Sequence, residues 1–182
     1  NELEPILKWS ETHVFSRFFI CWGAQHALNY YYQFDKITLS SKLFGIFKYK
    51  NILPSHPLMR GFDDQFEVPH SRHTRMDFST LDRHPELKVL SVHPDFGPDI
   101  LSTEDSRDLY IFGHLEYERN TLKSEYIRDI EKGADIGIPH NYFPDDDSNN
   151  EPFFNWKSHG HLLFNNWLNE TYQNTYYDLN DL

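Results

Sequence analysis

Residues 18–25, Phe18-Phe19-Ile20-Cys21-Trp22-Gly23-Ala24-Gln25, join an apolar run to a run with helical character. The apolar part, residues 14–20, predicts a β-strand, and its continuous apolar end is typical of a strand covered on both faces. Residues 24–32 predict a helix. Cys21 is therefore expected at the carboxyl end of a strand and the N-terminus of a helix, where α/β proteins place their active sites.

Cys21 is the only cysteine of the chain, which excludes an internal disulfide bond and a multi-cysteine zinc site and is typical of a reducing cytoplasm. The partial positive charge at a helix N-terminus favours the nucleophilic thiolate. We expect the Trp22 N–H to face the oxygen of an attacked carbonyl, and Gly23 to let the backbone pass tightly. The alternative is a buried cysteine that acts as a small hydrophobic residue.

His114 and Glu116 follow a second apolar run, residues 109–112, in the motif Gly113-His114-Leu115-Glu116. In extended backbone, residues two apart point to the same side, so Glu116 can orient the His114 ring and support its charged form. By itself a His-x-Glu pattern also occurs by chance. Combined with a cysteine at another strand end, it favours a nucleophile, a base and an orienting acid.

Strand-like and helix-like runs alternate along the whole chain, which predicts one α/β domain over residues 1–182 with a mainly parallel sheet. Turn residues at 95–98 and a polar, exposed loop at 141–152 separate some of the runs. Further strands are predicted at residues 43–49, 65–69, 87–92 and 100–102, and further helices at residues 1–11, 121–132 and 161–169. Because a core-facing helix opens the chain, we expect it to be the C-terminal part of a longer protein.

The composition limits the possible functions. The 182 residues include 17 Lys and Arg against 28 Asp and Glu, a formal net charge of −11, which argues against a nucleic-acid-binding surface. No apolar run approaches the roughly 18–20 residues of a membrane span. Aromatic residues make up 16% of the chain and supply core material. A cytoplasmic protein without nucleic-acid or membrane partners is expected.

Two histidine pairs raise the question of a metal site, namely His70 with His73 and His159 with His161. Their spacing lacks the helical His-Glu-x-x-His pattern, so we expect no metal. The alternative for the first pair is that Ser71 and Arg72 contact a substrate from a loop after the strand that ends near Pro69. The acidic run at residues 145–147 lacks the glycine and closing glutamate of a calcium loop.

Together these motifs resemble the MetA family of homoserine O-acyltransferases. The resemblance covers nearly the whole chain. The matching motifs are Ile20-Cys21-Trp22-Gly23-Ala24-Gln25, Arg60-Gly61-Phe62-Asp63-Asp64, Pro69-His70-Ser71-Arg72, Gly113-His114-Leu115-Glu116-Tyr117, Asn141-Tyr142-Phe143-Pro144, Ser158-His159-Gly160 and Leu162-Leu163-Phe164-Asn165-Asn166-Trp167-Leu168-Asn169.

The resemblance implies a flavodoxin-like fold, similar to class I glutamine amidotransferases, with helices on both faces of the sheet. It implies transfer of an acetyl or succinyl group from acyl-CoA to the hydroxyl of L-homoserine, the entry step to methionine synthesis, without a bound cofactor. Cys21 then matches the acyl-thioester nucleophile, His114 the proton acceptor and Glu116 its partner.

By the same resemblance Lys42, Ser71 and Arg128 match substrate-binding positions, although Lys42 also reads as a solvated loop charge and Arg128 as a helix surface residue. The strands that precede the nucleophile in the family are missing here. A serine acceptor, a glutamine amidotransferase-like thiol hydrolase and a non-catalytic fragment remain alternatives. A homodimer is compatible with the resemblance, but the sequence does not fix the oligomeric state.

Overall fold

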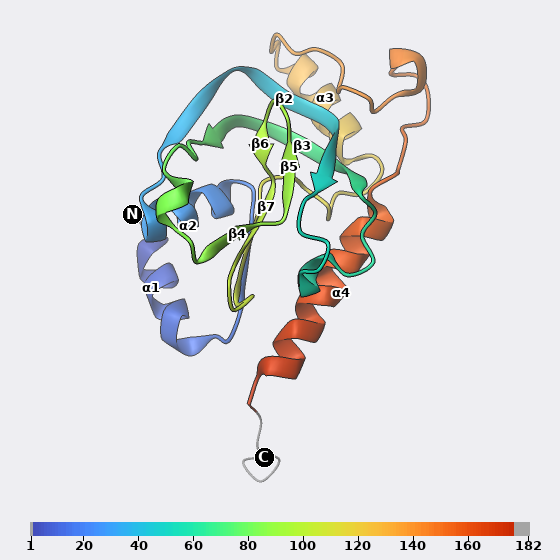
Figure 1. Cartoon of the computed structure of the whole chain (residues 1–182). Coiled ribbons are helices and arrows are strands. Elements are labelled where there is room, and N and C mark those ends of the chain that lie inside the picture. Colours follow the sequence, from blue (N-terminus) through green and yellow to red (C-terminus); the bar gives the residue numbers. More distant parts are fainter. Residues whose placement is uncertain (1, 177–182) are drawn as a thin grey trace.

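The computed structural model describes residues 2–176 and contains a four-stranded sheet around which the site is built (Figure 1). Its strand order is β1-β8-β7-β4. These strands span Arg17–Ile20 (β1), Asp108–Ile111 (β8), Ile100–Thr103 (β7) and Leu87–Val89 (β4). The apolar run at residues 109–112 therefore lies in an inner strand that ends at Ile111, and every residue of β8 is buried.

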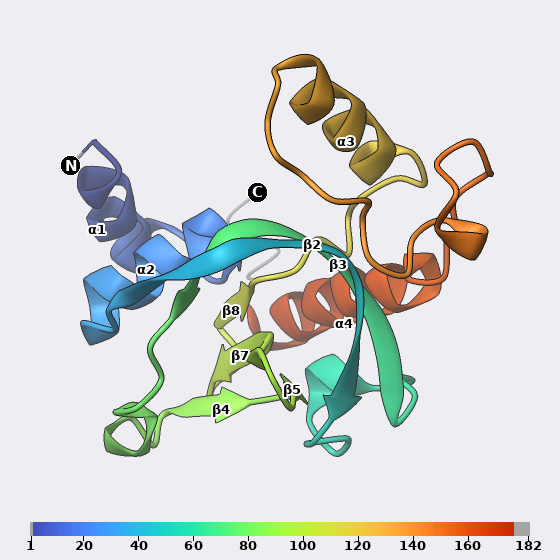
Figure 2. The same cartoon turned by 90° about the horizontal axis from the view of Figure 1, so that it is seen from above.

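Helices cover both faces of this sheet, as predicted. Helices α1 (Glu4–His13) and α2 (Trp22–Tyr32) pack on one face, where Tyr110 and Leu101 point, whereas α4 (Lys157–Asn174) packs on the face of Leu109 and Ile111. Figure 2 shows α2 and α4 on opposite sides of β8. Successive side chains of β8 point to opposite faces of the sheet and therefore belong to two different hydrophobic cores.

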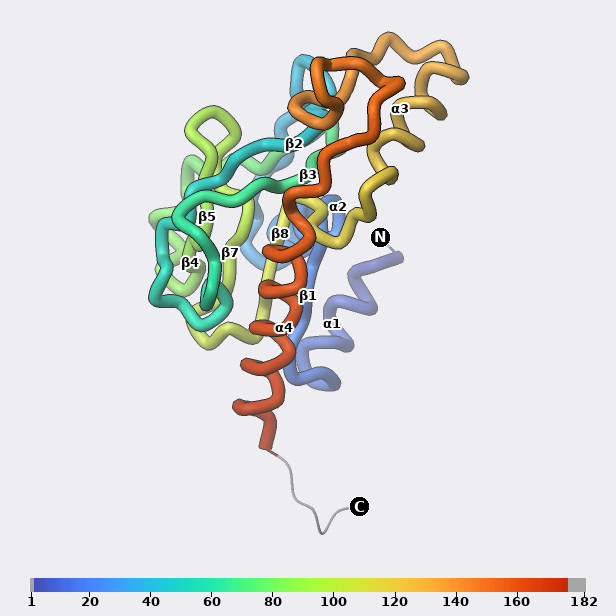
Figure 3. Tube along the Cα trace, turned by 90° about the vertical axis from the view of Figure 1, so that its right-hand side faces the viewer, coloured from blue at the N-terminus to red at the C-terminus, as the bar shows by residue number. Residues whose placement is uncertain are grey.

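A second sheet, with the order β3-β2-β5-β6, lies across the carboxyl end of the first. Its long strands are β2 (Lys36–Asn51) and β3 (Gln65–Met76), joined by a loop with a 3-10 turn at Pro57–Met59, and its short strands are β5 (Ser91–His93) and β6 (Gly97–Pro98). Helix α3 (Thr121–Glu131) lies beyond the β2–β3 pair, at the end of the molecule away from β4 (Figures 2 and 3).

The prediction of a mainly parallel sheet is wrong for residues 2–176. Only β1 and β8 pair in parallel within the first sheet, and all strand pairs of the second sheet are antiparallel. The reason is connection length. Short turns such as residues 94–96 between β5 and β6 and residues 104–107 between β7 and β8 can join only antiparallel strands, whereas a parallel pair needs a long crossover.

The remaining differences from the sequence prediction concern element boundaries. The strand predicted at residues 65–69 continues to Met76, the run at 87–92 splits at Leu90 into β4 and β5, and the last helix is longer at both ends. The segment at 141–152 is not wholly an exposed loop, because Tyr142 and Phe143 are buried and a 3-10 turn spans Pro144–Asp146. No helix within residues 2–176 is long and apolar enough to cross a membrane.

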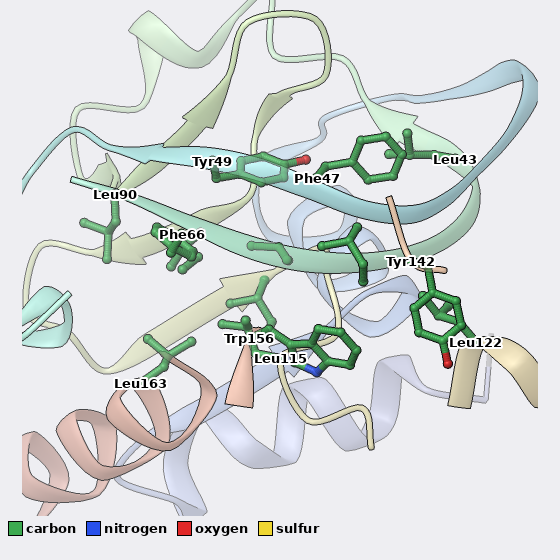
Figure 4. Close-up of a cluster of buried hydrophobic side chains, with 14 of the residues drawn as sticks. Leu43, Phe47, Tyr49, Phe66, Leu90, Leu115, Leu122, Tyr142, Trp156 and Leu163 are labelled. Atoms are coloured by element: carbon green, nitrogen blue, oxygen red, sulfur yellow. The ribbon is translucent and has the colours of Figure 1, made fainter. Parts of the chain in front are cut away.

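The larger core lies between the two sheets and α4. Side chains from β2, β3 and the segments around α4 converge there, including Tyr49, Phe66, Trp156 and Leu163 (Figure 4). All of these side chains are almost completely excluded from solvent. The core therefore ties α4 to both sheets.

Leu163 and Leu168 on α4 provide a matched test of this packing. Leu163 is 0% exposed and Leu168 is 56% exposed. We expect Leu163→Ala to lower the free energy of unfolding by about 2–5 kcal/mol, because it leaves a cavity. Leu168→Ala should change it by less than about 0.5 kcal/mol, the range of ordinary surface substitutions. Urea unfolding measures both, and equal losses would contradict the packing described.

Candidate active site

Cys21 occupies a strained turn between β1 and α2. Its backbone has φ 48° and ψ −113°, a positive φ that is uncommon for a residue other than glycine. Its N–H donates to the Ile111 carbonyl at 2.7 Å, and its own carbonyl accepts from the Gln25 N–H at 3.0 Å. The residue is half-buried, unlike a cysteine packed as a small hydrophobic residue. This geometry presents the thiol at the carboxyl end of the sheet.

The two residues after Cys21 differ in how they fit the prediction. Trp22 is the first residue of α2, so its N–H has no acceptor one turn earlier in the helix, as the oxyanion role requires. Its side chain is 55% exposed and stacks on the His26 ring at 5.4 Å. Gly23 is not needed for close passage, because a Cβ there would meet nothing within 4 Å.

His114 is held close to Cys21 by the backbone of three neighbouring segments. The β1–β8 register pairs Ile20 with Ile111, which places the segment after β8 beside the turn after β1. The His114 N–H donates to the Pro69 carbonyl at 2.8 Å, and the Gly113 N–H donates to the buried Asp99 Oδ1 at 2.7 Å. A Cβ at Gly113 would lie 2.1 Å from a Val68 methyl, so the turn requires glycine.

Cys21, His114 and Glu116 form one line of side chains. The distance between His114 Nδ1 and Glu116 Oε1 is 2.6 Å, and the Cys21 side chain is the other neighbour that acts on the charge of the ring. Burial by itself lowers the pKa of His114, but the contacts with Cys21 and Glu116 outweigh it and raise that pKa to about 9. The geometry thus supports a charged imidazolium between a sulfur and a carboxylate.

Tyr117 continues the site from His114 towards α3. Its ring stacks on the His114 ring with centroids 4.2 Å apart and an interplanar angle of 16°. Its hydroxyl donates to Glu125 Oε1 on α3 at 2.8 Å, and the other Glu125 oxygen accepts from the Ser71 hydroxyl of β3. Ser71 therefore lies next to the line of Cys21, His114 and Glu116 although it belongs to another sheet.

Lys42 and Arg128 join the same cluster through α3 carboxylates. The Lys42 ammonium lies 2.9 Å from Asp129 Oδ2 and 3.7 Å from Glu125 Oε2, and it is 3.9 Å above the centre of the Phe44 ring. Arg128 pairs with Asp129 at 2.7 Å and remains half-exposed. Hydrogen bonds from Lys42 and Arg128 hold the pKa of Asp129 below its usual value. The Lys42 side chain is 11% exposed, so it is not a solvated loop charge.

The expected loop after Pro69 is absent, because Ser71 and Arg72 lie within strand β3. Arg72 is buried and donates to the His70 ring and the Thr74 carbonyl. His70 is 0% exposed and faces Asp99 at 3.5 Å, while His159 faces Asp63 at 3.1 Å. Among residues 2–176 no cluster of three or more His, Cys, Asp or Glu side chains is arranged to hold a metal ion.

Comparison with known proteins identifies the family. The chain matches the family model described as homoserine O-succinyltransferase over residues 1–177. It belongs to this family. It is 47% identical over 183 aligned residues to a homoserine O-acetyltransferase of Clostridium beijerinckii, covering 100% of this chain and 60% of that protein. A homoserine O-acetyltransferase of Dinoroseobacter shibae is 44% identical over 179 residues, covering 98% of this chain and 59% of that protein.

The fold has wider relatives. A solved glutamine amidotransferase of Thermotoga maritima is similar with a TM-score of 0.63 and 10% sequence identity, over 92% of this chain and 66% of that chain. The predicted glutamine amidotransferase-like fold is therefore confirmed, as is the predicted family of homoserine O-acyltransferases. The chain spans about 60% of the length of the curated relatives that it matches.

Sequence reasoning missed residues that connect the site of this homoserine O-acyltransferase family member. Tyr117 was noted only as the end of a motif, and the two α3 carboxylates Glu125 and Asp129 were not singled out. A signal was present, because Glu125 and Asp129 are four residues apart and share one face of a predicted helix. Their partners Ser71 and Lys42 lie far away in sequence, so the contacts themselves are visible only in the fold.

The raised pKa of His114 gives a test of its contacts with Cys21 and Glu116. We expect NMR titration of the His114 ring to give a pKa of about 9 and Glu116→Gln to lower it, because that change removes the adjacent charge. The interactions that raise the His114 pKa stabilise the folded state. Their contribution is complete below pH 6.5, the ordinary pKa of histidine, and is lost as the pH rises through about 9.

The free energy of unfolding of the wild-type protein should therefore be higher than that of the Glu116→Gln variant. The difference between the two should be larger at pH 6 than at pH 10. Glu118→Gln removes an exposed carboxylate two residues later and is the matched control. If both variants show the same pH dependence as the wild-type protein, the proposed charge state of His114 is wrong.

Proposed function

We propose that the protein containing this chain transfers an acetyl or succinyl group from acyl-CoA to the hydroxyl of L-homoserine through an acyl-cysteine intermediate. Family membership supports the reaction class. The observation that carries the mechanism is the line from Cys21 through His114 to Glu116, with a 2.6 Å contact between His114 and Glu116. The proposed product, an O-acyl-homoserine, belongs to methionine synthesis. The mechanism needs no resident cofactor, because acyl-CoA is a substrate.

In the first half of the reaction the Cys21 thiolate attacks the thioester carbon of acyl-CoA. The Trp22 N–H, at the start of α2, stabilises the negative oxygen of the tetrahedral intermediate. When the intermediate collapses, the bond to the CoA sulfur breaks and His114 donates its proton to that sulfur. The enzyme is left with an acyl-cysteine and a neutral imidazole.

In the second half His114 acts as the base. Acylation removes the thiolate that helped to raise the pKa of His114, while burial continues to lower it. The neutral ring can then accept the proton of the homoserine hydroxyl as that oxygen attacks the acyl carbon. Collapse releases the ester and restores the thiolate beside the imidazolium. Glu116 bonds Nδ1 throughout, so Nε2 remains directed at the reacting groups.

The cluster around Glu125 supports an amino acid as the acceptor. An amino acid carries an ammonium and a carboxylate, and the cluster offers both signs of charge from two elements. Glu125 of α3 would face the ammonium group, while Lys42 of β2 and the half-exposed Arg128 would face the carboxylate. The Ser71 hydroxyl donates to Glu125 in the same cluster. Tyr117 contacts both Glu125 and His114, which supports an acceptor position beside His114.

Intact-mass spectrometry tests the intermediate directly. Full-length protein mixed with acetyl-CoA or succinyl-CoA should gain one acyl group, and Cys21→Ala should gain none. Glu116→Gln should slow transfer to homoserine roughly 100-fold or more, the usual contribution of a positioned base. An acyl adduct of equal amount on the Cys21→Ala variant would contradict the assignment.

Assays with homoserine and serine against both acyl-CoA donors identify the substrates. The matching family model is described as homoserine O-succinyltransferase, whereas the relatives are named homoserine O-acetyltransferase. Both acyl-CoA donors therefore belong in the experiment. Hydrolysis of glutamine without dependence on acyl-CoA would instead indicate an amidotransferase-like hydrolase.

A further inference from the structure

One side chain, Tyr117, touches both halves of the proposed active site. Its ring covers the His114 ring at 4.2 Å, and its hydroxyl donates to Glu125 at 2.8 Å. Burial and the neighbouring Glu125 carboxylate raise the pKa of the Tyr117 hydroxyl, so it stays protonated and acts as a donor at neutral pH. The contact therefore joins the base to the carboxylate of the acceptor site.

The backbone of Tyr117 is fixed on both sides, which holds the ring in place. Its N–H donates to the His114 carbonyl at 3.1 Å, and its carbonyl accepts from the indole N–H of Trp156 at 2.8 Å. Trp156 is 0% exposed and belongs to the larger core. A residue anchored in this way has little freedom to leave either partner, so a change at Glu125 is transmitted to the His114 ring.

The Tyr117 and Ser71 hydroxyls hold the two oxygens of Glu125. Oε1 accepts from Tyr117 and Oε2 accepts from Ser71, while the Lys42 ammonium lies 3.7 Å from Oε2 and closer, at 2.9 Å, to Asp129. Loss of the Tyr117 hydroxyl removes the donor to Oε1 and leaves the carboxylate held by Ser71 alone. Glu125 would then be less firmly placed to meet the ammonium group of an amino acid.

We propose that Tyr117 is a positioning residue that couples occupancy of the acceptor site to the orientation of His114. The inference rests on the proposed function, since it assigns the acceptor to Glu125 and Lys42. Its hydroxyl holds Glu125 ready for an ammonium group, and its ring holds the imidazole in the plane needed to receive the hydroxyl proton. Acylation of Cys21 by acyl-CoA depends only on the stacking of the Tyr117 ring on the His114 ring.

Two variants of the full-length protein separate these contributions. Tyr117→Phe keeps the stacked ring and removes the hydroxyl, so we expect an unchanged rate of acyl-enzyme formation and a KM for L-homoserine raised about tenfold. Tyr117→Leu also removes the stacking, so the rate of acyl transfer to homoserine should fall as well, by about tenfold or more. Tyr126→Phe removes a hydroxyl from the same end of the molecule, on α3, and should change neither value.

An NMR measurement in the absence of acyl-CoA keeps the test independent of turnover. L-homoserine should shift the His114 ring signal in the wild-type protein and in Tyr126→Phe, and much less in Tyr117→Phe. Equal shifts in all three proteins, or a wild-type KM in Tyr117→Phe, would overturn the coupling. Equal slowing of both half-reactions together with a lower Tm would show a merely structural role.

The outcomes also distinguish this inference from the proposed function. If the wild-type protein binds homoserine and shows the expected shift but forms no acyl-enzyme, the acyl-cysteine mechanism fails and the coupling stands. If homoserine does not bind to the wild-type protein, the acceptor assignment and the coupling both fail.

Discussion

The parallel pairing of β1 with β8 is the contact on which the site depends. Cys21 and His114 are 93 residues apart in sequence, and they meet because the two strands end at the same edge of the sheet. The hydrogen bond from the Cys21 N–H to the Ile111 carbonyl extends this pairing by one residue into the turn. Helices pack on both faces of this sheet, and every residue of β8 is buried while those of β1 are partly buried, so the sheet positions both side chains on a rigid base.

The second sheet adds the residues of the proposed acceptor site, because it crosses that same edge. Strand β3 contributes the Pro69 carbonyl that holds His114 and, two residues later, the Ser71 hydroxyl that meets α3. Strand β2 brings Lys42 to the same helix. A chain with a net charge of −11 thus concentrates two cations, Lys42 and Arg128, against the carboxylates of α3. Local placement, more than total charge, decides which ligand such a site can take.

The proposed catalytic residues can be predicted from the sequence because their signals are local. A strand run that ends in cysteine and enters a helix, and a strand run followed by Gly113-His114-Leu115-Glu116, each place one functional group without knowledge of the rest. The prediction of a mainly parallel sheet is wrong because short turns, such as residues 94–96 between β5 and β6, allow only antiparallel pairing. The contacts of Glu125 could not be predicted from the sequence for another reason. Its partners Tyr117, Ser71 and Lys42 come from a loop and two strands, and no spacing along the chain brings them together.

The charge state of His114 gives Cys21 and Glu116 separate parts in the proposed mechanism. Burial opposes a charged ring, and the contacts with Cys21 and Glu116 outweigh it and raise the pKa of His114 to about 9. In that mechanism, formation of the thioester would remove the charge on Cys21, so the ring would lose support for its proton at the step where it would act as a base. Glu116 would still bond Nδ1, which would leave Nε2 as the free acceptor. The two contacts would therefore serve successive steps of the proposed proton transfer.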